Sequence, residues 1–133
     1  MIKEDYVSFE VAKLLKEKGF VGESEIGDKC GFYEQNKEYP SQINLVYDDL
    51  DNSELERNEC LRFTLQMAMK WLREVHNIFI SIDIYSKDFE GNIRYCVNIY
   101  KYGSRMILDT PIICNSYEEA IQAAIKYVLE NLI

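Results

Sequence analysis

The chain has 133 residues, a formal net charge of −8 at pH 7 and a hydrophobic content of 47%. These values predict a single domain, residues 1–133, with a core that needs no disulfide or metal staples. The N-terminal residues mix charges at helical spacing, and no run of about 18 apolar residues occurs, so neither a signal peptide nor a membrane association is expected.

The acidic residues are concentrated in the first half of the chain. Residues 1–62 hold 15 acids and 8 bases, a net charge of −7, whereas residues 63–133 hold 8 acids and 7 bases, a net charge of −1. A phosphate-binding surface needs clustered Lys and Arg, and neither half has such a cluster. Direct binding of nucleic acid is therefore not expected.

Four cysteines, Cys30, Cys60, Cys96 and Cys114, are widely separated and form no CxxC pair. Without a secretory signal, this spacing indicates reduced, partly buried thiols in a cytoplasmic protein. Metal ligation by convergence of these cysteines is much less expected than packing, so we predict no metal and no cofactor.

A first helix is predicted over residues 8–18. Ser8 is its N-cap and Gly19 its left-handed end, and the apolar side contains Phe9, Val11, Ala12 and Leu15. The pattern then weakens. Two strand-like runs, residues 30–33 and 43–47, are able to pair as a short β-ribbon, and the acidic stretch 48–59 is expected to form an exposed loop or turn.

A second helix begins after Thr64 and ends at His76 and Asn77. Its predicted buried stripe is widened by Met69 and Trp71 and consists of Leu65, Ala68, Leu72 and Val75.

Strict alternation follows, with Ile78, Ile80, Ile82 and Ile84 on one face of a strand. A Gly91-Asn92 turn leads to a second alternating strand over residues 93–100, and a Gly103-Ser104 turn leads to a third over residues 105–108.

The last helix begins at a capping box formed by Ser116 and Glu119. Its buried stripe is Ile121, Ala124, Ile125 and Val128. The predicted fold class is therefore α+β: a three-stranded antiparallel β-meander in α-β-β-β-α order over residues 64–133, with an added helix at 8–18 and a short β-ribbon within 30–47.

This order resembles the architecture of double-stranded-RNA-binding domains. Those domains grip phosphates with lysines at the start of their second helix, where this chain has Tyr117, Glu118 and Glu119. Acids at that position repel phosphate, so the resemblance concerns architecture and not function.

A second resemblance lies in the amino-acid sequence of three stretches, DYVSFEVAKLLKEKGF, TLQMAMKWLREVHNIFI and SYEEAIQAAIKYVLENL. They are similar to the signature stretches of a family of small uncharacterised proteins from gut-bacterial genomes and their phages. The chain departs from that family at Arg62-Phe63, where Ala-Pro is expected. The resemblance implies a bacterial or phage origin and carries no activity.

Familiar catalytic and ligand motifs are missing from the sequence. His76 is the only histidine, and its place in the last turn of a helix favours a structural role. Asp49, Asp51 and Ser53 imitate the start of a calcium loop, but Glu54 replaces the required glycine. No phosphate-binding or nucleophile motif occurs, so an enzyme is the least favoured class and no catalytic residue is predicted.

The face of the sheet opposite the isoleucines is predicted to present Phe79, Tyr85, Tyr100 and Tyr102. We interpret these residues as a surface for a protein partner or for a second copy of the chain, in a non-catalytic accessory protein. The competing interpretation is that residues 20–61 or the first helix cover this face. Two alternatives remain open: an acidic mimic of nucleic acid that inhibits a DNA-binding protein, and an enzyme whose site cannot be recognised from sequence.

Overall fold

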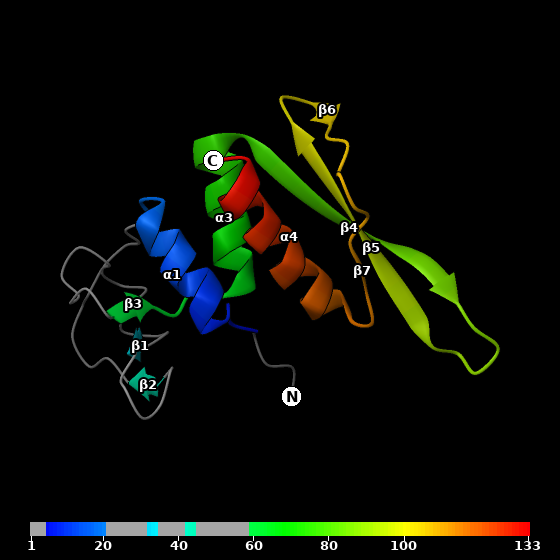
Figure 1. Ribbon diagram of the computed structural model, residues 1–133, viewed down its shortest axis with the longest axis horizontal. Coiled ribbons are helices and arrows are strands. Elements are labelled where there is room, and N and C mark those ends of the chain that lie inside the picture. The colour runs from blue at the N-terminus through cyan, green and yellow to red at the C-terminus, as the bar shows by residue number, and fades with distance from the viewer. Residues whose placement is uncertain (1–4, 21–31, 35–41, 45–58) are drawn as a thin grey trace. The chain divides into compact units, whose positions relative to one another are not determined.

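The computed structural model describes residues 5–20, 32–34, 42–44 and 59–133, of which 32–34, 42–44 and 59 are described by their backbone alone (Figure 1). The fold divides into two compact units, residues 1–68 and 69–133. The boundary lies inside the helix α3, Leu65–His76, which contributes residues to both units. The single domain over residues 1–133 stays a prediction.

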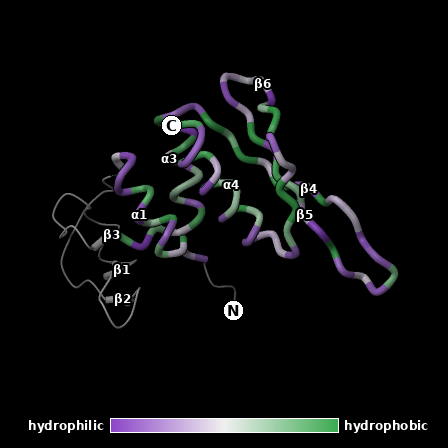
Figure 2. Tube along the Cα trace, viewed as in Figure 1, coloured by the Kyte–Doolittle hydropathy of each residue, from purple (hydrophilic) through white to green (hydrophobic). Residues whose placement is uncertain are grey.

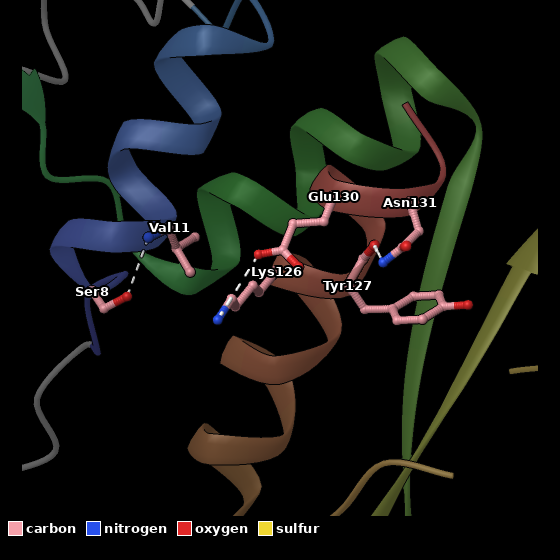
Figure 3. A network of polar contacts seen from close by, with 6 residues as sticks. All are labelled: Ser8, Val11, Lys126, Tyr127, Glu130 and Asn131. Atoms are coloured by element: carbon pink, nitrogen blue, oxygen red, sulfur yellow. Dashed lines mark hydrogen bonds and ion pairs between the residues drawn. The ribbon is translucent and has the colours of Figure 1, made fainter. Parts of the chain in front are cut away.

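The helix α1, Phe9–Glu17, begins and ends as its sequence predicts. The Ser8 hydroxyl oxygen accepts a hydrogen bond from the backbone N–H of Val11 at 3.3 Å (Figure 3). At the other end Gly19 has a φ of +93°, and the N–H of Phe20 donates to the carbonyl of Leu15 at 2.9 Å. This closing pattern is a Schellman motif, which satisfies carbonyls that the helix itself leaves unpaired.

A small antiparallel sheet in the order β2-β1-β3 belongs to the same unit. Its strands are β1, Phe32–Glu34, β2, Gln42–Asn44, and β3, Glu59–Leu61. Pairing of β1 with β2 confirms the predicted ribbon, but β3 was missed. Three residues are too few to show a period of two, and β3 follows an acidic stretch that was expected to be a loop.

Residues after β3 are joined to the start of the chain. The backbone N–H of Val7 donates to the carbonyl of Phe63 at 2.9 Å, and that of Leu65 donates to the carbonyl of Asp5 at 2.9 Å. The ring of Phe63 is fully buried and stacks on the ring of Phe20 at 4.1 Å between centroids. These contacts place the start of α3 beside α1 without any long-range signal in the sequence.

The helix α3 confirms its predicted ends. The Thr64 hydroxyl accepts from the N–H of Met67 at 3.2 Å, and Asn77 closes the helix with a φ of +54°. The predicted buried stripe is wrong at one position, because Val75 is 61% exposed whereas Leu72 is fully buried. Val75 lies in the last turn of α3, just before Asn77 reverses the chain. The buried side of the helix therefore ends at Leu72, one turn earlier than predicted.

The second unit contains a larger antiparallel sheet in the order β4-β5-β6, with β7 also paired to β5. The bounds are Ile78–Lys87 for β4, Ile93–Lys101 for β5, Ser104–Arg105 for β6 and Ile113–Cys114 for β7. The mixed α+β class and the antiparallel order are thereby confirmed. Figure 2 shows mostly hydrophobic residues along the inner part of the β4–β5 hairpin and mostly hydrophilic residues toward its tip.

The third strand position is shared by two short strands, which corrects the strand predicted over 105–108. Pairing with β5 stops after Arg105 and resumes at β7. We call the segment between these two strands, residues 106–112, the excursion. At its two ends, the N–H of Met106 donates to the carbonyl of Ile99 at 2.7 Å, and the N–H of Val97 donates to the carbonyl of Ile112 at 3.2 Å. Pro111 has no N–H to contribute to a ladder, which favours this interruption.

The helix α4, Tyr117–Asn131, packs on β4, β5 and β7. The Ser116 hydroxyl accepts from the N–H of Glu119 at 3.1 Å, which is one bond of the predicted capping box. Its buried residues are Ala120, Ile121, Ala124, Ile125, Val128 and Leu129. On its outer side the Lys126 ammonium lies 3.9 Å from the Glu130 carboxylate (Figure 3). Across the described part of the chain, no helix has the length and apolarity needed to span a membrane.

Candidate partner surface

The β4–β5 hairpin has two chemically different faces. The register pairs Phe79 with Tyr100, Ser81 with Asn98 and Asp83 with Cys96, and we call the side these residues share the aromatic face. Residues directly opposite each other in an antiparallel pair point to the same side. The other side, the helix face, contains Ile78, Ile80, Ile82 and Ile84 with Tyr95, Val97 and Ile99.

The four residues predicted as a partner surface occupy two places on this hairpin. Phe79 is 42% exposed and lies directly opposite Tyr100, and Tyr102 lies two residues after Tyr100 in the turn that follows β5. Tyr85 is 58% exposed and lies six residues further along β4, a distance of roughly 20 Å at the usual rise per residue. The aromatic residues therefore flank the middle of the face and do not form one cluster.

A polar pair occupies the middle of the aromatic face. Asn98 is buried, and its side-chain Nδ2 donates a hydrogen bond to the carboxylate of Asp83. Burial of an amide is favourable only when it is hydrogen-bonded, so this pair fixes the two strands relative to each other. The sequence placed Asn98 on this face but gave no signal for its partner, because the residues are fifteen positions apart.

Beside Asn98 the surface is hollowed into a cleft of about 450 Å³. The floor comes from β5 and one wall comes from the excursion between β6 and β7; the lining includes Tyr85, Cys96, Asn98, Arg105, Met106 and Leu108. Most of this lining is apolar, with Arg105 and Asn98 as the polar groups. A cleft of this kind suits an apolar side chain with a polar or anionic neighbour.

Tyr102 is held in an unusual backbone conformation. β5 and β6 pair Lys101 with Ser104, so the connecting loop is Tyr102-Gly103 and not the predicted Gly103-Ser104. Both loop residues have positive φ, +53° for Tyr102 and +79° for Gly103, as a type I′ turn requires. Asn, Asp or Gly is strongly preferred at such a position, and a bulky aromatic residue there carries a conformational cost. Tyr102 is nevertheless 75% exposed.

The remaining candidate groups do not converge on a reactive site. His76 is half-buried, its Nε2 atom has no hydrogen-bond partner, and its ring meets the Trp71 ring edge-on at 4.7 Å. The structural role of this histidine stays a prediction. Within the described ranges, no group of three or more His, Cys, Asp or Glu residues is arranged to hold a metal ion. The imitation calcium loop at Asp49 lies outside the described residues.

Three of the cysteines, Cys60, Cys96 and Cys114, are described as free thiols. Burial raises the pKa of Cys60 to about 11, and Lys16 and Lys13 oppose this shift without overcoming it. Burial also raises the pKa of Cys114, with a further upward contribution from Glu119. A raised pKa disfavours the thiolate, so neither Cys60 nor Cys114 has the character of a nucleophile.

Acidic side chains lie at the start of α4 and in the turn between β4 and β5. Glu118 and Glu119 lie in the first turn of α4 and are exposed. The turn between β4 and β5 is organised by Asp88, whose carboxylate accepts from the backbone N–H of Glu90 and of Asn92, each at 2.9 Å. Carboxylates at the start of α4 repel phosphate.

Comparison of the chain with protein-family models, with curated proteins and with solved structures found no match. The resemblance to the gut-bacterial and phage family therefore stays a prediction, and the aromatic face has to be interpreted from its own chemistry.

Proposed function

We propose that this chain is a non-catalytic protein-binding module that contacts its partner through the aromatic face of the β4–β5 hairpin. The observation that carries this proposal is Tyr102, an exposed aromatic residue in a left-handed position that suits Asn or Gly much better. A residue that adopts a backbone conformation against its local preference points to a role other than stabilising the fold.

The surroundings of Tyr102 support a protein as the partner. Phe79 and Tyr100 lie opposite each other on the same hairpin, and aromatic residues are enriched at the centres of protein interfaces. The nearby cleft is apolar and open, which suits insertion of a side chain from a partner. The acidic chain offers Arg105 at this cleft as a cation for an anionic group.

Affinity capture from the source cell with three matched baits tests the proposal. The baits are the unsubstituted chain, a Tyr102→Asn variant and a Val75→Ser variant. Val75 is an exposed apolar residue on α3 and so controls for loss of exposed apolar area. A protein enriched by the unsubstituted and Val75→Ser baits is then purified, and its affinity for all three is measured by titration.

Loss of affinity with Tyr102→Asn alone supports the aromatic face, and one anchoring aromatic residue is expected to contribute about 2 kcal/mol, or roughly thirtyfold in affinity. Equal affinity of the three baits for the captured protein, or capture by none of them, would contradict the proposal.

A further inference from the structure

The outer edge of β4 belongs to a strand of 10 residues, the longest described in the chain. β4 ends the sheet order β4-β5-β6, and no described strand pairs with its other side. A free edge presents a row of backbone N–H and C=O groups, which is a template for another strand. Figure 1 shows the hairpin of β4 and β5 projecting past α4, with this edge along its length.

The backbone groups on this edge belong to the isoleucines. Val97 donates to Ile112 and Ile99 accepts from Met106, so the backbone groups of Val97 and Ile99 point away from β4. The groups of Asn98 and its alternate neighbours therefore point toward β4 and bond to Phe79, Ser81 and Asp83, which lie opposite them. By the same alternation, Ile80, Ile82 and Ile84 direct their N–H and C=O groups outward.

Exposure along the isoleucine row rises toward the outer end of the strand. Ile78 is fully buried on the helix face, Ile80 and Ile82 are half-buried, and Ile84 is 66% exposed. The side chains next to the free edge are thus apolar and increasingly uncovered. A partner strand would cover them with its own side chains of the same face.

The usual protections of an edge strand are confined to the far end of β4. A bulge lies between Ile84 and Ser86, and Lys87 is the last residue of the strand. Between Ile78 and Ile84 the strand contains no Lys and no Pro, and its one charge, Asp83, is engaged by Asn98. Such features prevent an exposed edge strand from pairing with another chain. An edge strand without them is expected to pair with another strand in the functional protein.

We propose that a second copy of this chain pairs antiparallel with the outer edge of β4, about a twofold axis at Ile82. This register sets Ile82 opposite Ile82 of the second copy and Ile80 opposite Ile84. All three of these isoleucines carry outward backbone groups, so every pair exchanges hydrogen bonds across the axis. The two sheets then form one continuous sheet.

Side-chain chemistry selects this register among its neighbours. With the axis at Ile82, Phe79 lies opposite Tyr85 on the aromatic face, and Asp83 lies opposite Ser81. A shift of the axis to Asp83 would place two carboxylates directly opposite each other, which is destabilising. A shift to Ser81 would place Phe79 opposite Asp83 and leave Tyr85 unmatched.

This inference goes beyond the proposed function because it concerns the edge of the sheet, whereas partner binding uses its aromatic face. The two are separated by variants. Tyr102 lies in the turn after β5 and takes no part in the edge register, so Tyr102→Asn tests the face alone, whereas Ile84→Lys tests the edge.

Sedimentation of the full chain over a concentration series up to about 100 µM tests the pairing. The unsubstituted chain is expected to have twice the mass of one chain at the upper end, and Ile84→Lys is expected to stay a monomer with an unchanged circular dichroism spectrum. Ile107→Lys is the matched control, since Ile107 is 93% exposed and lies away from the edge. It should dimerise like the unsubstituted chain.

Disulfide trapping tests the register. Opposed residues of a hydrogen-bonded pair have Cα atoms about 5.5 Å apart, which a disulfide spans. An Ile82→Cys variant is expected to cross-link to itself on mild oxidation, whereas Ile80→Cys and the unsubstituted chain are not. A monomeric unsubstituted chain, or a dimer that survives Ile84→Lys, would overturn the proposal. A dimer that cross-links through Ile80→Cys and not through Ile82→Cys would overturn the register.

Discussion

The two halves of the β4–β5 hairpin have the same sequence pattern and different surroundings. In the inner half, Ile78 and Ile99 are fully buried and α4 covers the helix face. In the outer half, Ile84 and Tyr85 are mostly exposed, and Phe89 at the turn is fully exposed. Alternation along a strand fixes which side chains share a face, but the length of the covering helix fixes how many of them are buried. On the helix face, the outer half is therefore left open to contact.

The largest expected effect comes from a matched pair of truncations across this divide. Ile99→Ala removes a fully buried side chain and should lower the free energy of unfolding by about 2–5 kcal/mol. Ile84→Ala removes the corresponding side chain from an exposed position, and its effect on the monomer should be within about 0.5 kcal/mol. Denaturant unfolding at low protein concentration measures both. Equal losses would show that the two halves are covered alike.

A smaller effect of opposite sign is expected from Tyr102→Asn. Asn adopts positive φ more readily than Tyr, so the variant should be more stable by about 0.5–1 kcal/mol while it loses affinity for a partner. Gly103→Ala is the opposite control, because an L side chain is strained at a φ of +79°. Thermal unfolding of the two variants checks the signs. A destabilised Tyr102→Asn would mean that the tyrosine serves the fold.

The pH dependence of stability separates a covered position from the uncovered hairpin. Because the folded pKa of Cys60, about 11, lies above its ordinary value of 9.0, the neutral thiol contributes stability that is fully present below pH 9 and is lost as pH rises toward 11. Cys60→Ala should remove this loss, which denaturant unfolding between pH 8 and 11 would show. An unchanged slope in Cys60→Ala would contradict the assignment.

The smallest effect is expected in the outer turn, where hydrogen bonds from Asn92 lower the pKa of Asp88. Its carboxylate contributes local order that is present above the ordinary pKa and is lost as pH falls through the lowered value. Acidification or Asp88→Ala should therefore lower the protection factor of the Asn92 amide, taken relative to its intrinsic exchange rate at each pH, while that of Ile99 is unchanged. Loss of protection at both positions would indicate that the two halves unfold together.

Much of this fold follows from local signals in the sequence. Ser8, Gly19, Thr64, Asn77 and Ser116 mark helix ends, and each of them caps or closes a helix in the structure. These signals act over four residues or fewer, so one sequence is enough to find them. The alternation of β4 and β5 is equally local, and it identified Phe79, Tyr85 and Tyr100 as the aromatic side of the hairpin.

The missing parts depend on contacts between distant residues. β3 exists because β1 lies beside it, Asn98 is buried because Asp83 pairs with it, and the excursion after Arg105 depends on two bonds to β5. The cleft is a consequence of that excursion, so it had no signal of its own in the sequence. The exposure of Val75 was missed for a related reason, because periodicity does not show where the packing against a helix face ends.

Amide hydrogen exchange along β4 tests the central claim, that its outer edge is free in one chain and paired between two. At low protein concentration Phe79, Ser81 and Asp83, which bond to β5, should be protected, whereas Ile80, Ile82 and Ile84 should exchange freely. Raising the concentration should protect the three isoleucine amides and leave the others unchanged. Isoleucine amides that are protected at every dilution, or that stay unprotected at every concentration, would contradict the account.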